Sequence, residues 1–156
     1  MARHGVRVTW SRNGAAFVDS QYSRAHAWTF DGGATVQASS SPSVLPPPLS
    51  DPAHVDPEEA LVAAASSCHM LWFLTIAAGL GYVVDSYEDE AEGTMGRNAA
   101  GRVAMVRITL RPRILFSGQT PTPRQLQEFH AASHAHCMIA NSLTTEFVVE
   151  EPVTLP

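Results

Sequence analysis

Two cysteines in polar surroundings are the residues of this sequence best suited to chemistry. Cys68 lies in the tetrapeptide Ser-Ser-Cys-His (66–69) inside a long apolar run, and Cys137 follows His-Ala-His (134–136). A thiolate is a nucleophile, and two thiols that meet can form a disulfide. The alternative is that both cysteines are small buried apolar side chains, which is the commoner fate of cytosolic cysteines. The residues alone leave both interpretations open.

A reactive Cys68 needs a cation nearby. A free cysteine has a pKa of about 8.5, and a decrease of about 2 units would make it mostly thiolate at neutral pH. The dipole of a helix fades within its first turn, and Cys68 lies about three turns into the helix predicted around it. The chain contains no lysine. The cation must therefore be a guanidinium or an imidazolium, so an arginine from elsewhere in the fold or a protonated His69 must supply it.

The element that must position Cys68 is a central helix from Asp56 to Ala78. Asp56 is a suitable N-cap, Pro57 fits the first helical position, and two glutamates follow in the first turn. No charged residue occurs between 60 and 78, so we expect a core helix that is covered on every side. A membrane span is the alternative, but the polar cluster in its middle and the lack of flanking arginine argue against it. Because 156 residues offer little cover, we expect a homodimer.

The remaining pattern predicts an α+β fold with an antiparallel sheet packed against two main helices. Before the central helix we expect a strand at 5–10, a hairpin turn at Asn13-Gly14 leading to 16–18, extended structure at 22–30, a short strand near Val36 and an irregular loop at 39–56. After it we expect a strand beginning at 82–84 and an acidic stretch at 87–95 that pairs with a long arginine-bearing strand at 102–114. The chain then forms a helix from Thr122-Pro123 to about 134 or 136, which Cys137 closes, and a final strand at 146–150.

Composition limits the possible functions. The net charge of −5 does not favour nucleic acid binding, and 45% hydrophobic residues suffice for a core. The length predicts a single domain over residues 1–156. The first residues lack an apolar leader, so we expect a cytoplasmic protein.

Two motifs resemble the OsmC/Ohr family, the osmotically inducible and organic hydroperoxide resistance proteins. Residues 56–68 (Asp-Pro-Glu-Glu-Ala-Leu-Val-Ala-Ala-Ala-Ser-Ser-Cys) are similar to its Pro-Glu-Glu-Leu-x-x-Ala-x-x-x-x-Cys signature, and residues 137–141 (Cys-Met-Ile-Ala-Asn) to its Cys-Pro-x-Ser-Asn motif. The order of the elements also matches. Met138, Ala140 and His69 depart from the pattern, which indicates a divergent branch.

The resemblance implies a thiol peroxidase without a cofactor. In that reading Cys68 is the peroxidatic thiolate, Cys137 is the resolving thiol, and an arginine–glutamate pair tunes the first. Glu58 is the glutamate by motif position; Arg24 is our choice for the arginine, with Arg12 as the fallback. The substrate would be an organic hydroperoxide, and an external dithiol, lipoyl-type or another thiol, would recycle the disulfide.

Helix geometry places a condition on this site. Ten residues along a straight helix separate Glu58 from Cys68 by about 15 Å and rotate it by about 80°. Either the helix bends, or Glu58 and its arginine serve the Cys68 of the other subunit; we favour the second, which agrees with a homodimer.

Two other functions compete with the peroxidase. His130 and His134 are spaced four apart, and with His136, Cys137 and His69 they suggest a metal site. The other is a non-enzymatic module of the same fold that binds a small ligand in an apolar cleft.

Overall fold

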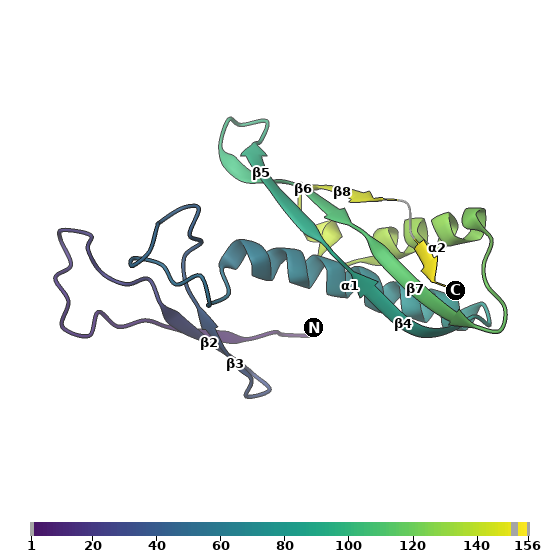
Figure 1. Cartoon of the computed structure of the whole chain (residues 1–156), viewed down its shortest axis with the longest axis horizontal. Helices are drawn as coiled ribbons and strands as arrows, with labels where there is room; N and C mark the ends of the chain where they lie inside the picture. The colour runs from purple at the N-terminus through teal and green to yellow at the C-terminus, as the bar shows by residue number, and fades with distance from the viewer. Residues whose placement is uncertain (1, 151–152, 156) are drawn as a thin grey trace. The chain divides into compact units, whose positions relative to one another are not determined.

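The computed structural model describes residues 2–150 and 153–155, which fall into two compact units, Met1–Ala60 and Leu61–Pro156. The single domain predicted from length is not tested by this division and stays a prediction. In chain order the elements are β1 (Val6–Thr9), β2 (His26–Phe30), β3 (Thr35–Ala38), α1 (Pro57–Gly79), β4 (Val83–Asp89), β5 (Glu92–Arg97), β6 (Val103–Leu110), β7 (Pro112–Ser117), α2 (Pro123–His136), a 3-10 turn η1 (Ala140–Ser142), β8 (Glu146–Val149) and β9 (Val153–Leu155) (Figure 1).

The first unit contains an antiparallel sheet in the order β1-β2-β3. The hairpin predicted after Asn13-Gly14 is wrong in part. The turn forms, with positive φ at both residues and a bond from the Ala15 N–H to the Arg12 carbonyl, but residues 16–18 form no strand and β1 pairs with β2 instead. The backbone partner of β1 is β2, and Phe17 instead packs its ring on Tyr22.

The predicted irregular loop over 39–56 forms no named strand or helix. Its two ends are tied together: the Val55 N–H donates to the Gln37 carbonyl at 3.1 Å, and the Asp51 N–H donates to the buried Ser39 hydroxyl at 2.9 Å. The loop therefore returns to the end of β3 before it enters α1.

The central helix is confirmed, with a capping box at its start. The Glu59 N–H donates to Asp56 Oδ1 at 2.8 Å, and the Asp56 N–H donates to Glu59 Oε2 at 3.1 Å. At the other end Gly81 takes the left-handed conformation, with φ of 84°, that lets the Tyr82 N–H reach the Ala77 carbonyl.

Only one face of α1 is buried within the chain, which differs from the expected all-round cover. The buried residues recur every fourth position and are Ala65, His69, Phe73 and Ala77. From Ala63 onwards the exposed residues of the other face are uncharged and are Ala63, Ala64, Ser67, Leu71, Thr75 and Ala78, whereas Glu59 is exposed on the same face in the first turn. By length and composition α1 would suffice to cross a membrane, and it serves here as the core helix of the second unit.

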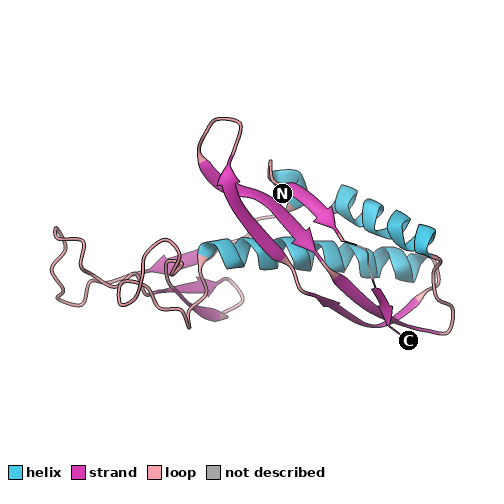
Figure 2. Ribbon diagram, turned by 45° about the horizontal axis from the view of Figure 1, so that its top comes forward, coloured by secondary structure: helices cyan, strands magenta, loops and turns pink. Residues whose placement is uncertain are grey.

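The second unit packs α1 and α2 against two small sheets, in the orders β4-β7-β9 and β5-β6-β8. The strands lie along one side of the two helices (Figure 2). The α+β class is confirmed, but the sheets are mixed, since β8 runs parallel to β6 and β9 parallel to β7. The core joins both helices to β7 through Phe73, Ile114 and Phe129.

The single long strand predicted over 102–114 is wrong. It divides at Arg111 into β6 and β7, which belong to different sheets and pair with β5 and β4 respectively. Two features cause the break: Pro112 has no N–H to donate to a neighbouring strand, and the Arg111 N–H donates to Asp89 Oδ1 at 2.6 Å.

The C-terminal strand β9 was not predicted from the sequence. Helix α2 is confirmed, including Thr122 as its N-cap in a capping box with Gln125.

Candidate active site

The structure brings the two cysteines together. Cys68 on α1 is partly exposed, Cys137 at the C-cap of α2 is buried, and the two thiols lie close enough for Cys68 to raise the pKa of Cys137. Burial raises the pKa of the Cys137 thiol, and the neighbouring Cys68 thiol raises it further. The N–H of Ala140, which donates to Cys137 Sγ at 3.3 Å, acts in the opposite direction. Cys137 therefore tends to keep its proton.

The turn that carries Cys137 is fixed to the end of α2. The Cys137 N–H donates to the carbonyl of Ser133 at 2.9 Å, which closes the helix. Asn141, the last residue of the second motif, donates from Nδ2 to the Ala135 carbonyl at 3.0 Å. These bonds hold the sulfur at a defined place after the last helical turn.

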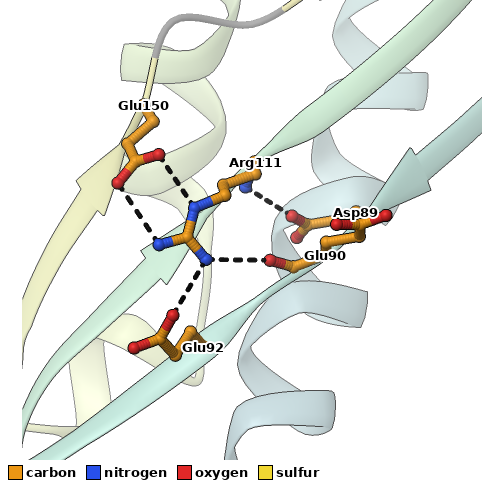
Figure 3. Close-up of polar contacts among 5 residues, drawn as sticks. All are labelled: Asp89, Glu90, Glu92, Arg111 and Glu150. Carbon is orange, nitrogen blue, oxygen red and sulfur yellow. Dashed lines mark hydrogen bonds and ion pairs between the residues drawn. The ribbon is translucent and has the colours of Figure 1, made fainter.

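A polar network holds α1 near Cys68. The Ser66 hydroxyl donates to one oxygen of Asp89, whose other oxygen accepts the Arg111 N–H. The Arg111 guanidinium binds Glu150 at 2.8 Å and Glu92 at 3.2 Å, and it donates to the backbone carbonyl of Glu90 (Figure 3). Hydrogen bonding to Glu150, against a smaller effect of desolvation, raises the pKa of Arg111. The network ties α1 to the ends of β4, β6 and β8.

The other two predicted site residues line one cavity, which lies within the first unit. Its volume is about 540 Å³. The lining residues are Val8, Trp10, Phe17, Tyr22, Arg24, His26, Ser39, Ser40, Val44, Pro57 and Glu58. A volume of this size is typical of small-molecule sites. Arg12, the fallback arginine, does not line the cavity and donates to the Ala15 carbonyl.

Arg24 is held by its own loop. Its Nη1 donates to the carbonyls of Ser20, at 2.9 Å, and of Tyr22, and its guanidinium carbon lies 3.7 Å from the centre of the Tyr22 ring. No ion pair joins Arg24 to Glu58 in the described part of the chain. The cavity thus holds a guanidinium and a carboxylate that share it without bonding to each other.

Three aromatic side chains form one wall of the cavity, which the sequence pattern does not predict. Phe17 stacks on Tyr22 with centroids 4.7 Å apart, and Trp10 lies 5.2 Å from Tyr22 and 6.0 Å from Phe17. Because Phe17 and Arg24 both lie over the Tyr22 ring, they take its opposite faces. The sequence signal for this wall is the occurrence of three aromatic residues within 13 positions, in a stretch that is predicted to form strands.

The metal-site alternative is not supported. His130 points to His69, the ring of His134 lies 5.3 Å from Phe147, and His136 stacks on Trp72 at 4.9 Å. Residues 2–150 and 153–155 contain no group of three or more His, Cys, Asp or Glu side chains placed to hold a metal ion. The spacing of four along α2 therefore does not produce a converging ligand set.

Comparison with known proteins gives concordant matches. The family model described as OsmC-like protein matches residues 50–151. An OsmC-like protein of unknown function from Vibrio cholerae is similar with 52% sequence identity and a TM-score of 0.93, over 99% of this chain and 100% of that one. An organic hydroperoxide resistance protein from Elizabethkingia anophelis shares the fold at 13% identity and a TM-score of 0.67, over 99% and 96% of the two chains. No curated protein matches the chain.

Proposed function

This chain belongs to the OsmC-like family, and from that premise we propose that it is a thiol-dependent hydroperoxide reductase. The family and its hydroperoxide resistance members support a role in redox stress. The observation that carries the finer proposal is the contact between a partly exposed Cys68 and a buried Cys137. An attacking thiolate has to be reached by substrate, whereas a resolving thiol has only to reach the first sulfur.

The proposed reaction has three balanced steps. The Cys68 thiolate attacks the terminal oxygen of the hydroperoxide, the O–O bond breaks, and the alkoxide takes a proton to leave as an alcohol. Cys137 then attacks the sulfenic acid of Cys68, so that an S–S bond forms and water leaves with the thiol proton. An external dithiol finally reduces the disulfide by two thiol–disulfide exchanges and is itself oxidised.

The raised pKa of Cys137 fits this order of events. The raised pKa keeps the Cys137 thiol protonated while Cys68 acts as the nucleophile. The same proton leaves with the hydroxide when the disulfide forms. Because Cys137 is buried, we expect the external dithiol to attack the sulfur of Cys68.

Arg24 and Glu58 are the proposed activating pair, with the aromatic wall as the binding surface for the organic part of the substrate. The guanidinium suits a developing alkoxide or thiolate, and Glu58 suits the guanidinium. Ten residues of helix separate Glu58 from the Cys68 of the same chain, about 15 Å along the axis. We therefore assign the pair of one copy to the Cys68 of a second copy.

The exposed face of α1 supports a second copy as the partner. Leu71 is 60% exposed there, and small uncharged residues surround it. The two hydroxyls of this face are already satisfied, since Ser67 donates to the Ala63 carbonyl at 2.7 Å and Thr75 to the Leu71 carbonyl at 2.8 Å. From Ala63 to Ala78 the face thus carries no charged side chain, which is typical of a permanent interface.

The deciding experiment is intact mass after one equivalent of cumene hydroperoxide. The wild-type chain is expected to lose two hydrogens as the Cys68–Cys137 disulfide forms. Cys137→Ser is expected to gain one oxygen instead, and a dimedone adduct would identify it as the sulfenic acid. An unchanged mass would contradict the peroxidase and favour the binding module.

Arg24→Met is expected to slow oxidation of Cys68 by about 100-fold, since removing one preorganised donor from a reacting centre typically costs this much. Raising the pH should recover part of the loss, because the thiolate then forms without the cation. Stopped-flow measurement of single-turnover oxidation checks both results. Arg12→Met is the matched control, because Arg12 does not line the cavity; a slow Arg12 variant with a normal Arg24 variant would reverse the assignment.

Leu71→Glu is expected to shift the protein to monomers in sedimentation velocity at micromolar concentration. A carboxylate buried in an apolar interface must be desolvated or must break that interface. Leu80→Glu is the control, because Leu80 is 59% exposed and follows the end of α1. A wild-type protein that sediments as a monomer would contradict the dimer.

A further inference from the structure

Two buried histidines that the proposed reaction leaves unused connect α1 to α2. His69 is 1% exposed and His130 is 3% exposed, and His69 Nε2 lies 2.9 Å from His130 Nδ1. The ring planes differ by only 7° and the centroids are 5.2 Å apart. The two bonded nitrogens are 2.9 Å apart while the ring centroids are 5.2 Å apart, so each nitrogen lies on the side of its ring that faces the other ring. The nearly parallel rings therefore meet end to end in one plane. The hydrogen bond is therefore well aligned and directional.

The surroundings make the pair a neutral one. Desolvation by burial lowers the pKa of His69 to about 4, against an opposing effect of Asp89 on β4 and a smaller lowering by His134 on α2. Burial and then the neighbouring His69 lower the pKa of His130 to about 3. Both rings are thus uncharged at neutral pH, and a single N–H is shared between them. The Phe73 ring lies over His130 at 4.6 Å, so water has little access.

The tautomer follows from the unpaired nitrogen. His130 Nε2 is buried and has no hydrogen-bond partner in the described part of the chain. A buried N–H without an acceptor is rarer and costlier than an acceptor without a donor. The proton of His130 therefore belongs on Nδ1, from which it is donated to His69 Nε2.

The pair and the cysteines bridge the same two helices. His69 directly follows Cys68, and His130 precedes Cys137 by seven residues, which is close to two helical turns. Later residues of α1 meet earlier residues of α2, as the contact of Phe73 with Phe129 shows, so the helices run antiparallel. A slide or a rotation of α2 on α1 would therefore do two things at once: it would break the hydrogen bond between the imidazoles, and it would move Cys137 away from Cys68.

We propose that the His69–His130 hydrogen bond is the positioning contact that holds Cys137 against Cys68 for disulfide formation. Apolar side chains alone tolerate small slides between helices, whereas one buried polar pair selects a single register. The inference rests on the Cys68–Cys137 disulfide of the proposed function, but it does not depend on what oxidises the thiols. His69 and His130 touch no reacting atom and act only through the helices.

The test is the equilibrium of the cysteine pair in glutathione buffer, without any peroxide. His69→Leu and His130→Leu are each expected to lower the effective concentration of the two thiols about tenfold, which is about 30 mV in a two-electron potential. His69→Gln places an amide near the position of Nε2 and is expected to keep the wild-type potential. His69→Asn is too short to reach His130 and is expected to behave like the leucine variant.

The double variant His69→Leu/His130→Leu separates positioning from stability. It leaves no unpaired nitrogen from the pair, so its melting temperature should recover while its potential stays shifted. Wild-type potentials in the leucine and asparagine variants would overturn the proposal, as would a potential that merely follows the melting temperature. If the leucine variants do not fold, the asparagine and glutamine variants decide. A shifted potential together with no reaction with hydroperoxide would uphold the positioning role and reject the peroxidase.

Discussion

Replacing Cys68 with serine is expected to lower kcat/KM for cumene hydroperoxide by on the order of 10⁵-fold, the scale on which loss of a catalytic nucleophile is felt. A serine hydroxyl is far less ionised and does not attack an O–O bond at neutral pH. The measurement is consumption of hydroperoxide with dithiothreitol as the reductant. The residual rate should equal that of the reductant alone.

Cys137→Ser is the matched variant, because it leaves the first sulfur in place. It should consume one equivalent of hydroperoxide at the wild-type rate and then stop or continue slowly with excess thiol, since no internal thiol resolves the sulfenic acid. If Cys137→Ser lost the first step while Cys68→Ser kept it, the two roles would have to be exchanged. That result would conflict with the burial of Cys137 and the partial exposure of Cys68.

The helices could be predicted from the sequence because their end signals are local. Asp56 and Thr122 each satisfy an N–H in the first turn of their own helix, and a proline follows each of them. The strands were harder, because their pairing is set by partners far away in the chain. Arg111 illustrates this: its alternation with apolar neighbours is that of a strand, yet Asp89, 22 residues earlier, takes its N–H and ends β6.

Candidate site residues could be named from the sequence, but their arrangement could not. Cys68 and Cys137 stood out by their polar neighbours, and the structure brings them together. The aromatic wall around Phe17 was missed, because the Asn-Gly turn before it has the composition of a hairpin. The sequence grouped His69 with His130 and His134 as possible metal ligands, whereas the structure joins His69 directly to His130 and places His134 against Phe147.

Acid is expected to destabilise this protein well above the range in which carboxylates titrate. In the folded state burial lowers the pKa of His69 to about 4 and that of His130 to about 3, from an ordinary value of 6.5. Below pH 6.5 these two histidines therefore bind protons in the unfolded chain but not in the folded chain. Stability from this pair is fully present above pH 6.5 and is lost as the pH falls towards 4. With two protons taken up on unfolding, the free energy of unfolding should fall by up to about 2.7 kcal/mol per pH unit.

Urea unfolding between pH 7 and pH 5 measures this slope directly. His69→Leu/His130→Leu removes both titrating groups, so its free energy of unfolding should vary much less over the same interval. His54→Leu provides the control, since His54 lies in the first unit beside Asp51 and not in the helix core; its slope should match that of the wild type. Equal slopes in the wild type and the double variant would mean that the imidazoles take up protons while folded. The end-to-end bond would then already be broken at pH 5, and a neutral pair would not hold α1 to α2 in acid.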